Sequence, residues 1–212
     1  AYSSIVAAGA NACVLHYRAN RGQARDGDLV LIDAGAEYQG YAADITRTFP
    51  ANGRFSKAQR ELHELVDAAR AAALEQARPG VPYEAGHHAA VRVLTEGLLR
   101  LGLLKGSLER NLASGDYKRY YRHKTGHWLG LDVHDVGDYR IDGQSRLLEP
   151  GMVFTIEPGL YIPAGDTSVP AKWRGIGIRI EDDVAITKDG HEVLTDGLAR
   201  SADEIEAFMA AR

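Results

Sequence analysis

Two aspartates lie within an otherwise strand-like segment near the start of the 212-residue chain. The segment DLVLIDAGAEYQGYAADITRTF, residues 28–49, contains Asp33 and Asp44 between apolar runs. A hairpin centred on Tyr38 and Gln39 would place the two carboxylates directly opposite each other, where like charges destabilise a sheet. The segment therefore predicts a positive group between them, which could be an arginine, a lysine or a metal ion. A register shifted by one residue through a bulge would instead put them on opposite faces.

Two further acidic residues leave apolar segments late in the chain. Glu157 ends MVFTIE, and Glu181 interrupts GIGIRIED. Charged side chains are rarely buried without a partner, and we expect Arg179 to be the one strand arginine that could offset four converging carboxylates. Two divalent cations would neutralise all four charges. Such an oxygen-rich site suits Mn, and an added imidazole extends the choice to Co, Zn or Fe.

A glycine-rich segment, HKTGHWLGLDVHDVGDY, supplies the imidazole candidates His123, His127 and His134. Glycines between the histidines let the backbone approach a site closely. The spacing does not match the helical zinc motif H-E-x-x-H. Because a single histidine is more often a surface or core residue than a ligand, the residues alone leave both roles open.

The order of predicted elements is strands, then helices, then strands. Ser56 followed by Gln59 predicts a capped helix start, and Pro79-Gly80 predicts its end. This order is typical of an α+β domain whose helices lie on one side of an antiparallel sheet. LVLIDAG and VFTIEPG share one pattern, which suggests two similar halves that each deliver two carboxylates. Helices are expected over residues 56–80, 82–101 and 202–211, and strands over 28–49, 152–159, 175–187 and 192–195.

Composition excludes several classes of protein. The net charge is −4 without a basic cluster, so nucleic acid is not an expected partner. No apolar run approaches the ~20 residues of a membrane span, and the first residues lack the basic head of a signal peptide, so we expect a cytoplasmic protein without membrane contact. The single cysteine, Cys13, excludes an internal disulfide and is expected to pack in the interior rather than act as a nucleophile.

Five residues in a fixed order carry a resemblance to a known family. The set resembles the ligands of the pita-bread metallopeptidases and consists of Asp33, Asp44, His127, Glu157 and Glu181. The segments HWLGLDVHDVG, LEPGMVFTIEPGLYIP and WRGIGIRIEDDVAIT resemble the bacterial aminopeptidase P branch of that group. The likeness covers essentially the whole chain. It implies a pita-bread fold, with two similar halves of an antiparallel sheet and helices on the outer side.

The resemblance implies a role for each ligand. Asp33 would contact one of two cations, and His127 and Glu157 would contact the other. Asp44 and Glu181 would bridge both. In these terms the positive group between the two early aspartates is a metal ion, most plausibly Mn.

It also implies roles around the ligands. Glu157 would act as general base, while His134 would bind the substrate carbonyl and its transition state. The other matching residues are His16 near the scissile bond, His123 in the proline pocket, and Tyr161 and Arg179 beside Asp33. From the residues alone, an ordinary ion pair between Arg179 and Glu181 fits nearly as well.

The implied activity is removal of the first residue from peptides with proline in second position. A prolidase, which cleaves Xaa-Pro dipeptides, shares the same residues and is the alternative. A non-catalytic peptide-binding domain of the same fold is a further one. The resemblance also implies that residues 1–212 are a catalytic domain lacking its amino-terminal part and an upstream domain. We expect the chain to associate with that segment and to form homo-oligomers.

Overall fold

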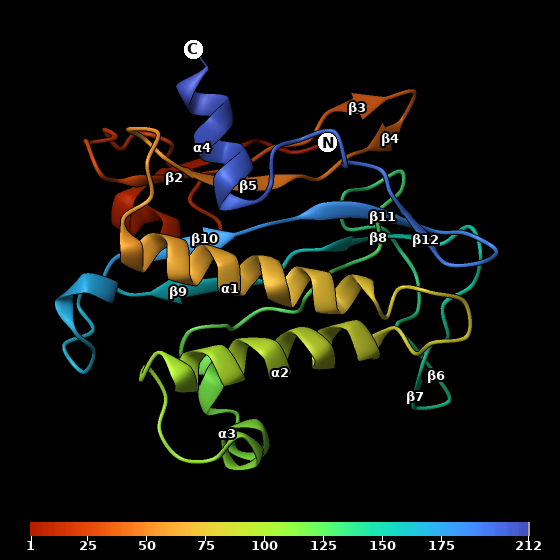
Figure 1. The fold of residues 1–212 in the computed structure, drawn as a ribbon. Helices are drawn as coiled ribbons and strands as arrows, with labels where there is room; N and C mark the ends of the chain where they lie inside the picture. The colour runs from red at the N-terminus through yellow and green to blue at the C-terminus, as the bar shows by residue number, and fades with distance from the viewer. Residues whose placement is uncertain (212) are drawn as a thin grey trace.

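The amino-terminal half is built on a three-stranded antiparallel sheet in the order β1-β2-β5. The computed structural model describes residues 1–211. Buried and partly buried residues alternate along β2 and β5, as expected for strands with one covered face. A small hairpin, β3-β4, connects these two strands (Figure 1). The bounds are β1 (Ile5–Ala8), β2 (Leu29–Asp33), β3 (Glu37–Tyr38), β4 (Tyr41–Ala42) and β5 (Thr46–Pro50).

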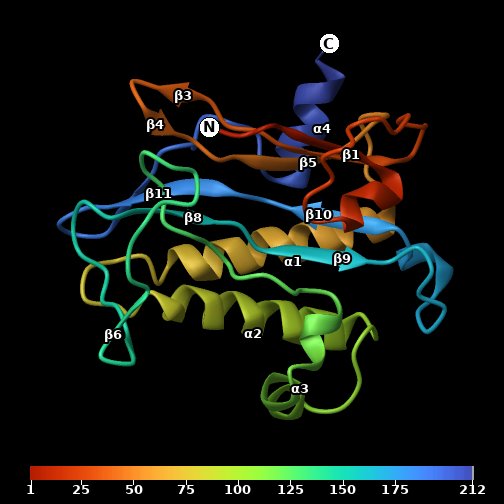
Figure 2. The same ribbon diagram turned by 180° about the vertical axis from the view of Figure 1, so that it is seen from behind.

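The carboxyl-terminal half repeats this plan with antiparallel strands. One sheet has the order β12-β11-β8, and β9 pairs with β10. The strands β8 to β11 are almost wholly buried because helices cover one face and the first half covers the other (Figures 1 and 2). The bounds are β6 (Arg140–Ile141), β7 (Gln144–Ser145), β8 (Val153–Ile156), β9 (Gly159–Ile162), β10 (Ile176–Arg179), β11 (Asp182–Ile186) and β12 (His191–Val193).

The two halves meet along one seam, where β5 lies beside the junction of β10 and β11. The Glu181 N–H donates to the Thr46 carbonyl at 3.0 Å. The Thr48 hydroxyl donates to the Arg179 carbonyl at 2.9 Å. This seam places the ends of strands from both halves next to each other, as the predicted repeat required.

Two long helices, α1 and α2, lie side by side on one face of the strand layer (Figures 1 and 2). Ser56 caps α1 through the predicted capping box with Gln59, and the buried side of α1 includes Leu62, Leu65 and Val66. Gly97 of α2 allows close packing, since a Cβ there would lie 2.2 Å from Leu65 Cδ1 of α1. The bounds are α1 (Lys57–Leu74), α2 (Glu84–Arg100), α3 (Leu108–Ser114) and α4 (Ala202–Ala210).

The register of the first hairpin differs from the predicted one. The turn centres on Gln39 and Gly40, both with positive φ, and Asp33 faces Thr46. A two-residue turn of this type needs φ > 0 at both central positions, which glycine accepts readily. The predicted direct opposition of Asp33 and Asp44 is therefore wrong. Because the pairing shifts by a whole pleat of two residues, both aspartates nevertheless stay on one face.

Several elements of the structure were not predicted from the sequence. The short helix α3 and the strands β1 and β9 were not expected, and α1 ends at Leu74, before the predicted stop. The expectation of a single strand arginine is wrong, because Arg47 lies in β5. Cys13 is half-buried and its thiol donates to the Ile162 carbonyl at 3.3 Å, so it is not fully interior.

Arg47 and Arg70 enclose a carboxylate that the sequence did not single out. Asp182, fully buried at the start of β11, pairs with Arg47 Nη2 at 2.7 Å and Arg70 Nη1 at 3.0 Å. A third bond comes from the Thr195 hydroxyl at 2.8 Å. This network ties β5, α1 and β11 together and satisfies a charge that would otherwise be costly to bury.

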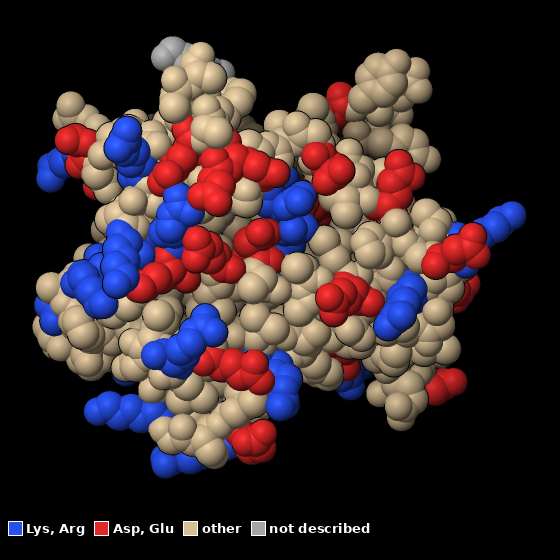
Figure 3. Space-filling model, viewed as in Figure 1, with Lys and Arg blue, Asp and Glu red and all other residues tan. Residues whose placement is uncertain are grey.

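The surface carries mixed charge, and no helix within residues 1–211 is long and apolar enough to cross a membrane. Figure 3 shows acidic and basic side chains intermingled on the face that carries α1. At the start of α1, Arg60 Nη1 lies 2.7 Å from Asp203 Oδ1 of α4. The cytoplasmic location stays a prediction.

His63 of α1 predicts a pH dependence of stability. It is fully buried against the Phe55 ring, and desolvation lowers its pKa from 6.5 to about 4. As the pH falls, His63 therefore binds a proton in the unfolded chain before it does so in the folded protein. The free energy of unfolding should fall for this reason by on the order of 3 kcal/mol as the pH drops from 6.5 to about 4. Denaturant unfolding at several pH values across that window would give the free energy of unfolding of the wild type and of His63→Leu. This free energy should fall less with decreasing pH in the variant, and an equal fall in both proteins would refute the assignment.

Candidate metal centre

Four acidic residues from both halves converge at the seam. Asp33 ends β2 and Asp44 precedes β5, while Glu157 follows β8 and Glu181 lies between β10 and β11. All four line one cavity of about 830 Å³. The convergence predicted from the strand ends is confirmed.

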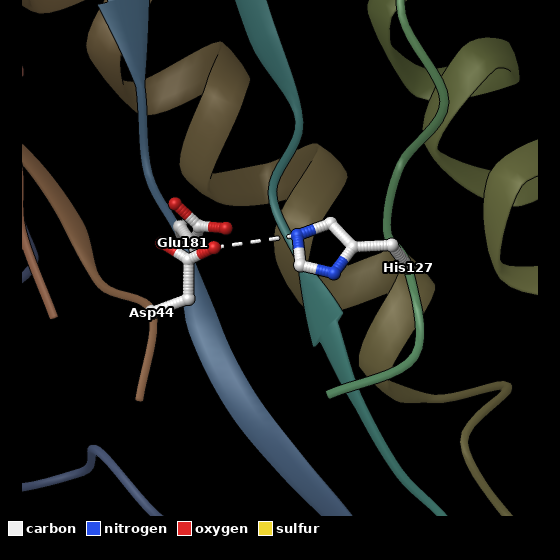
Figure 4. A group of neighbouring side chains, drawn as sticks. All are labelled: Asp44, His127 and Glu181. Carbon is white, nitrogen blue, oxygen red and sulfur yellow. Dashed lines mark ion pairs between the residues drawn. The ribbon is translucent and has the colours of Figure 1, made fainter. Parts of the chain in front are cut away.

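Three side chains form the tightest group. Asp44, His127 and Glu181 each offer a ligand atom, and these atoms lie within 4.8 Å of one another. His127 Nε2 is 3.3 Å from Asp44 Oδ2. Figure 4 shows His127 reaching from the loop on one side toward the two carboxylates on the other.

Glu157 lies at the edge of this group, between two histidines. Its Oε1 is 3.6 Å from His127 Nε2, and its Oε2 is 3.7 Å from His123 Nδ1. Desolvation raises the pKa of Glu157 to about 7, although the Arg179 charge acts in the opposite direction.

Asp33 has a charged partner of its own. Arg179 Nη2 donates to Asp33 Oδ2 at 2.5 Å, and Arg179 Nη1 donates to the Tyr161 hydroxyl at 3.2 Å. The buried guanidinium is thus one of the positive groups anticipated near the early aspartates. It pairs with Asp33 across the seam, and the alternative ion pair with Glu181 is not formed among the described contacts.

Electrostatics favour a bound cation at this centre. Burial raises the pKa of Asp33 and, far more strongly, that of Glu181, and in both cases the Arg179 charge offsets only part of the effect. Burial alone lowers the pKa of His127, but its hydrogen bond to Asp44 and the Glu157 charge raise it overall. Carboxylates so costly to ionise, beside an imidazole nitrogen, match the donor set that divalent transition metals prefer.

The backbone around His127 explains how the loop reaches the centre. The Thr155 N–H donates to the His127 carbonyl at 2.9 Å, and the Glu157 N–H donates to the Thr125 carbonyl at 2.7 Å. Gly126 permits this approach, since a Cβ there would lie 1.9 Å from the Thr155 carbonyl oxygen. The segment therefore runs alongside β8 as an extra strand-like edge.

The remaining sequence-derived candidates surround the same cavity. The His134 ring stands edge-on to His127, with centroids 4.3 Å apart, and exposed His16 also lines the cavity. His123 Nε2 lies 2.8 Å from the Tyr161 hydroxyl. The structure thus brings all the predicted site residues to one place, where His16 and His134 are exposed.

Two polar contacts to the carboxylates were missed by the sequence patterns. The Tyr2 hydroxyl contacts Oδ1 of both Asp33 and Asp44. The Thr46 hydroxyl donates to Glu181 Oε2 at 2.5 Å. No spacing rule connects Tyr2 to aspartates more than thirty positions away. Only the polar face of β5, with its threonines, gave a signal for Thr46.

Buried carboxylates and an imidazole that line one cavity form a donor set suited to divalent metal ions. The chain belongs to metallopeptidase family M24, because the model of that family matches residues 1–188. The Xaa-Pro aminopeptidase of Escherichia coli strain K12 is 52% identical over 210 residues, which are 99% of this chain and 47% of that protein. The chain spans about half the length of the curated relatives it matches.

Solved structures give the same result. The aminopeptidase PepP of Pseudomonas aeruginosa superposes with a TM-score of 0.98 at 58% identity, covering 99% of this chain and 48% of that chain. Zn-substituted Escherichia coli aminopeptidase P in complex with product gives a TM-score of 0.95 at 52% identity, with 99% and 47% covered. These structures confirm the pita-bread α+β fold expected from the sequence.

Tyr2 predicts a change in metal affinity. Tyr2→Phe keeps the ring but removes the hydroxyl that contacts both aspartates, so the carboxylates lose a shared restraint. Losing an outer hydrogen-bond partner of this kind should weaken binding of a divalent metal by about tenfold or more. Chelator competition measures this, with exposed Tyr38→Phe as the matched control. Equal affinity in the two variants would mean that Tyr2 only packs against the site.

Proposed function

We propose that this chain carries the catalytic site of an Xaa-Pro aminopeptidase that works with two divalent cations. The observation that carries the proposal is the meeting of four carboxylates and the His127 imidazole on the floor of one cavity. The names of the relatives supply the substrate class, since several are Xaa-Pro aminopeptidases.

The proposed ligand assignment follows the positions of the side chains. Asp33 would contact one cation, and His127 with Glu157 the other. Asp44 and Glu181 would bridge the pair, in keeping with their place in the tightest group. Mn is the proposed metal, because an oxygen-rich set with one imidazole suits it, and Co, Zn or Fe would also fit.

The chemistry proposed is hydrolysis of the peptide bond before proline. When bound, the cations would polarise the peptide carbonyl and make water more acidic. Glu157 lies beside the ligand group, where it would take a proton from the attacking water and pass it to the leaving imino nitrogen. His134, which packs edge-on to His127, would donate to the carbonyl oxygen as negative charge develops there.

The cavity wall would position the peptide. His123, held by the Tyr161 hydroxyl, would face the proline ring, and His16 would lie near the scissile bond. Arg179 binds both Tyr161 and Asp33, so it would couple the wall to the metal ligands. Homo-oligomers and a cytoplasmic location remain part of this proposal.

Substrate length tests the proposal. Metal-stripped protein resupplied with Mn should cleave an Xaa-Pro-Xaa tripeptide much faster than the matched Xaa-Pro dipeptide. Preference for the dipeptide would identify a prolidase instead. Bound metal without cleavage of either peptide would favour the non-catalytic peptide-binding alternative.

The bridging carboxylates predict a joint loss of metal and activity. Glu181→Gln or Asp44→Asn keeps the shape of the side chain but removes a charge shared by both cations. Each variant should fall below one bound metal per chain, by elemental analysis, and lose measurable turnover. Either variant with two metals and full turnover would contradict the bridging role.

For His134 we expect a loss of activity without a loss of metal. His134→Ala should keep its metal content, because the imidazole is assigned to the substrate oxygen. Turnover should drop by about a hundredfold, as when an oxyanion donor is removed. A variant that also loses metal would show that His134 is itself a ligand.

A further inference from the structure

A buried hydroxyl outside the ligand set connects three polar side chains. Thr125 Oγ1 lies 2.6 Å from the Tyr121 hydroxyl and 2.8 Å from His87 Nδ1. Thr125 is 5% exposed and Tyr121 is 1% exposed. We call these three residues the Thr125 network. His87 comes from α2 and lines the same cavity as the carboxylates.

Only one assignment of donors and acceptors satisfies both hydroxyl groups of the network. Burial lowers the pKa of His87 to about 4, so its ring is neutral and one nitrogen accepts. If Tyr121 donates to Thr125, and Thr125 donates to His87 Nδ1, every hydroxyl proton has an acceptor. The reverse direction leaves the buried Tyr121 proton without an acceptor among the described contacts, which is costly. The Thr125 hydroxyl is therefore both an acceptor and a donor here.

The network supports one wall of the cavity. The Tyr121 ring packs edge-on against His123, with centroids 4.9 Å apart. The Thr125 carbonyl accepts the Glu157 N–H at 2.7 Å. Fixing the Thr125 hydroxyl from α2 therefore fixes the ring that supports His123, whereas the bond to Glu157 is made by the backbone alone.

His127 is held without this hydroxyl. Its N–H donates to Thr155 Oγ1 at 3.1 Å, and its carbonyl accepts the Thr155 N–H at 2.9 Å. Its Nδ1 lies 3.0 Å from the Trp128 carbonyl, which leaves Nε2 for the carboxylate side. Loss of the Thr125 hydroxyl should thus disturb His123 while leaving the metal ligand in place.

We propose that Thr125 is a positioning residue that sets the affinity for the substrate's proline, acting through Tyr121 on His123 and anchored to α2 by His87. The inference rests on the proposed function, because it assigns His123 to the proline-binding wall. It extends that function to three residues that contact neither the cations nor the scissile bond. The competing explanation is that the network only stabilises the fold.

One matched pair of variants separates these explanations. Thr125→Val replaces the hydroxyl with a methyl group of similar size, and Thr125→Ser keeps the hydroxyl. Thr125→Val should raise KM for an Xaa-Pro tripeptide, and Kd for the Pro-containing product by calorimetry, each by about tenfold, the effect of losing a well-buried hydrogen bond. Its kcat and metal content should stay within about twofold of the wild type. Thr125→Ser should restore KM, and Thr167→Val, at an exposed threonine, should change nothing.

The same measurements can overturn the proposal. A Thr125→Val protein with unchanged KM and Kd but a lower Tm would show a structural role alone, and loss of metal would show an effect through His127. If Thr125→Val fails to fold, Tyr121→Phe removes the other hydroxyl and must show the same rise in KM and Kd. A wild-type protein that neither cleaves nor binds Xaa-Pro peptides would refute the proposed function itself. An active wild type together with an unaffected Thr125→Val variant would refute only the role of Thr125.

Discussion

The seam between β5 and the β10–β11 junction is the constraint on which the site depends. One backbone bond and one side-chain bond join Thr46 to Glu181, which lies 135 positions further along the chain. Carboxylate side chains lie at the strand ends along this seam. Packing the two halves together therefore also places several negative charges close to one another. Arg179, bonded to Asp33 and Thr46 across the seam, offsets part of that charge. The structure therefore couples the packing of the two halves to the assembly of a centre that favours cations.

Sequence patterns predicted the features that depend on local physics. The capping box of Ser56 and Gln59 begins α1 as expected, because a cap and its partner lie within one helical turn. The convergence of the four acids was also predicted, since apolar strands ending in carboxylates leave few alternatives to a shared site. The pita-bread fold came from the order of the five ligand-like residues, a pattern specific to one family.

Features that depend on distant segments could not be predicted in this way. The hairpin register was wrong because the turn at Gln39 and Gly40, not the spacing of the acids, decides which residues pair. Tyr2 and Thr125 were missed because an aromatic or hydroxyl residue in a loop gives no periodic signal. Their partners are brought near them only by the complete fold. The side chains proposed to contact metal or substrate left a clear sequence pattern, whereas those proposed to orient them did not.

Asp182 lies between Arg47 and Arg70, which precede it in the sequence by 135 and 112 positions. During synthesis on the ribosome, both arginines emerge long before the carboxylate that they enclose. Until then they stay hydrated, and β5 has no partner at the seam. The nascent chain thus cannot complete this network, or the seam beside it, until the sheet that contains Asp182 has formed.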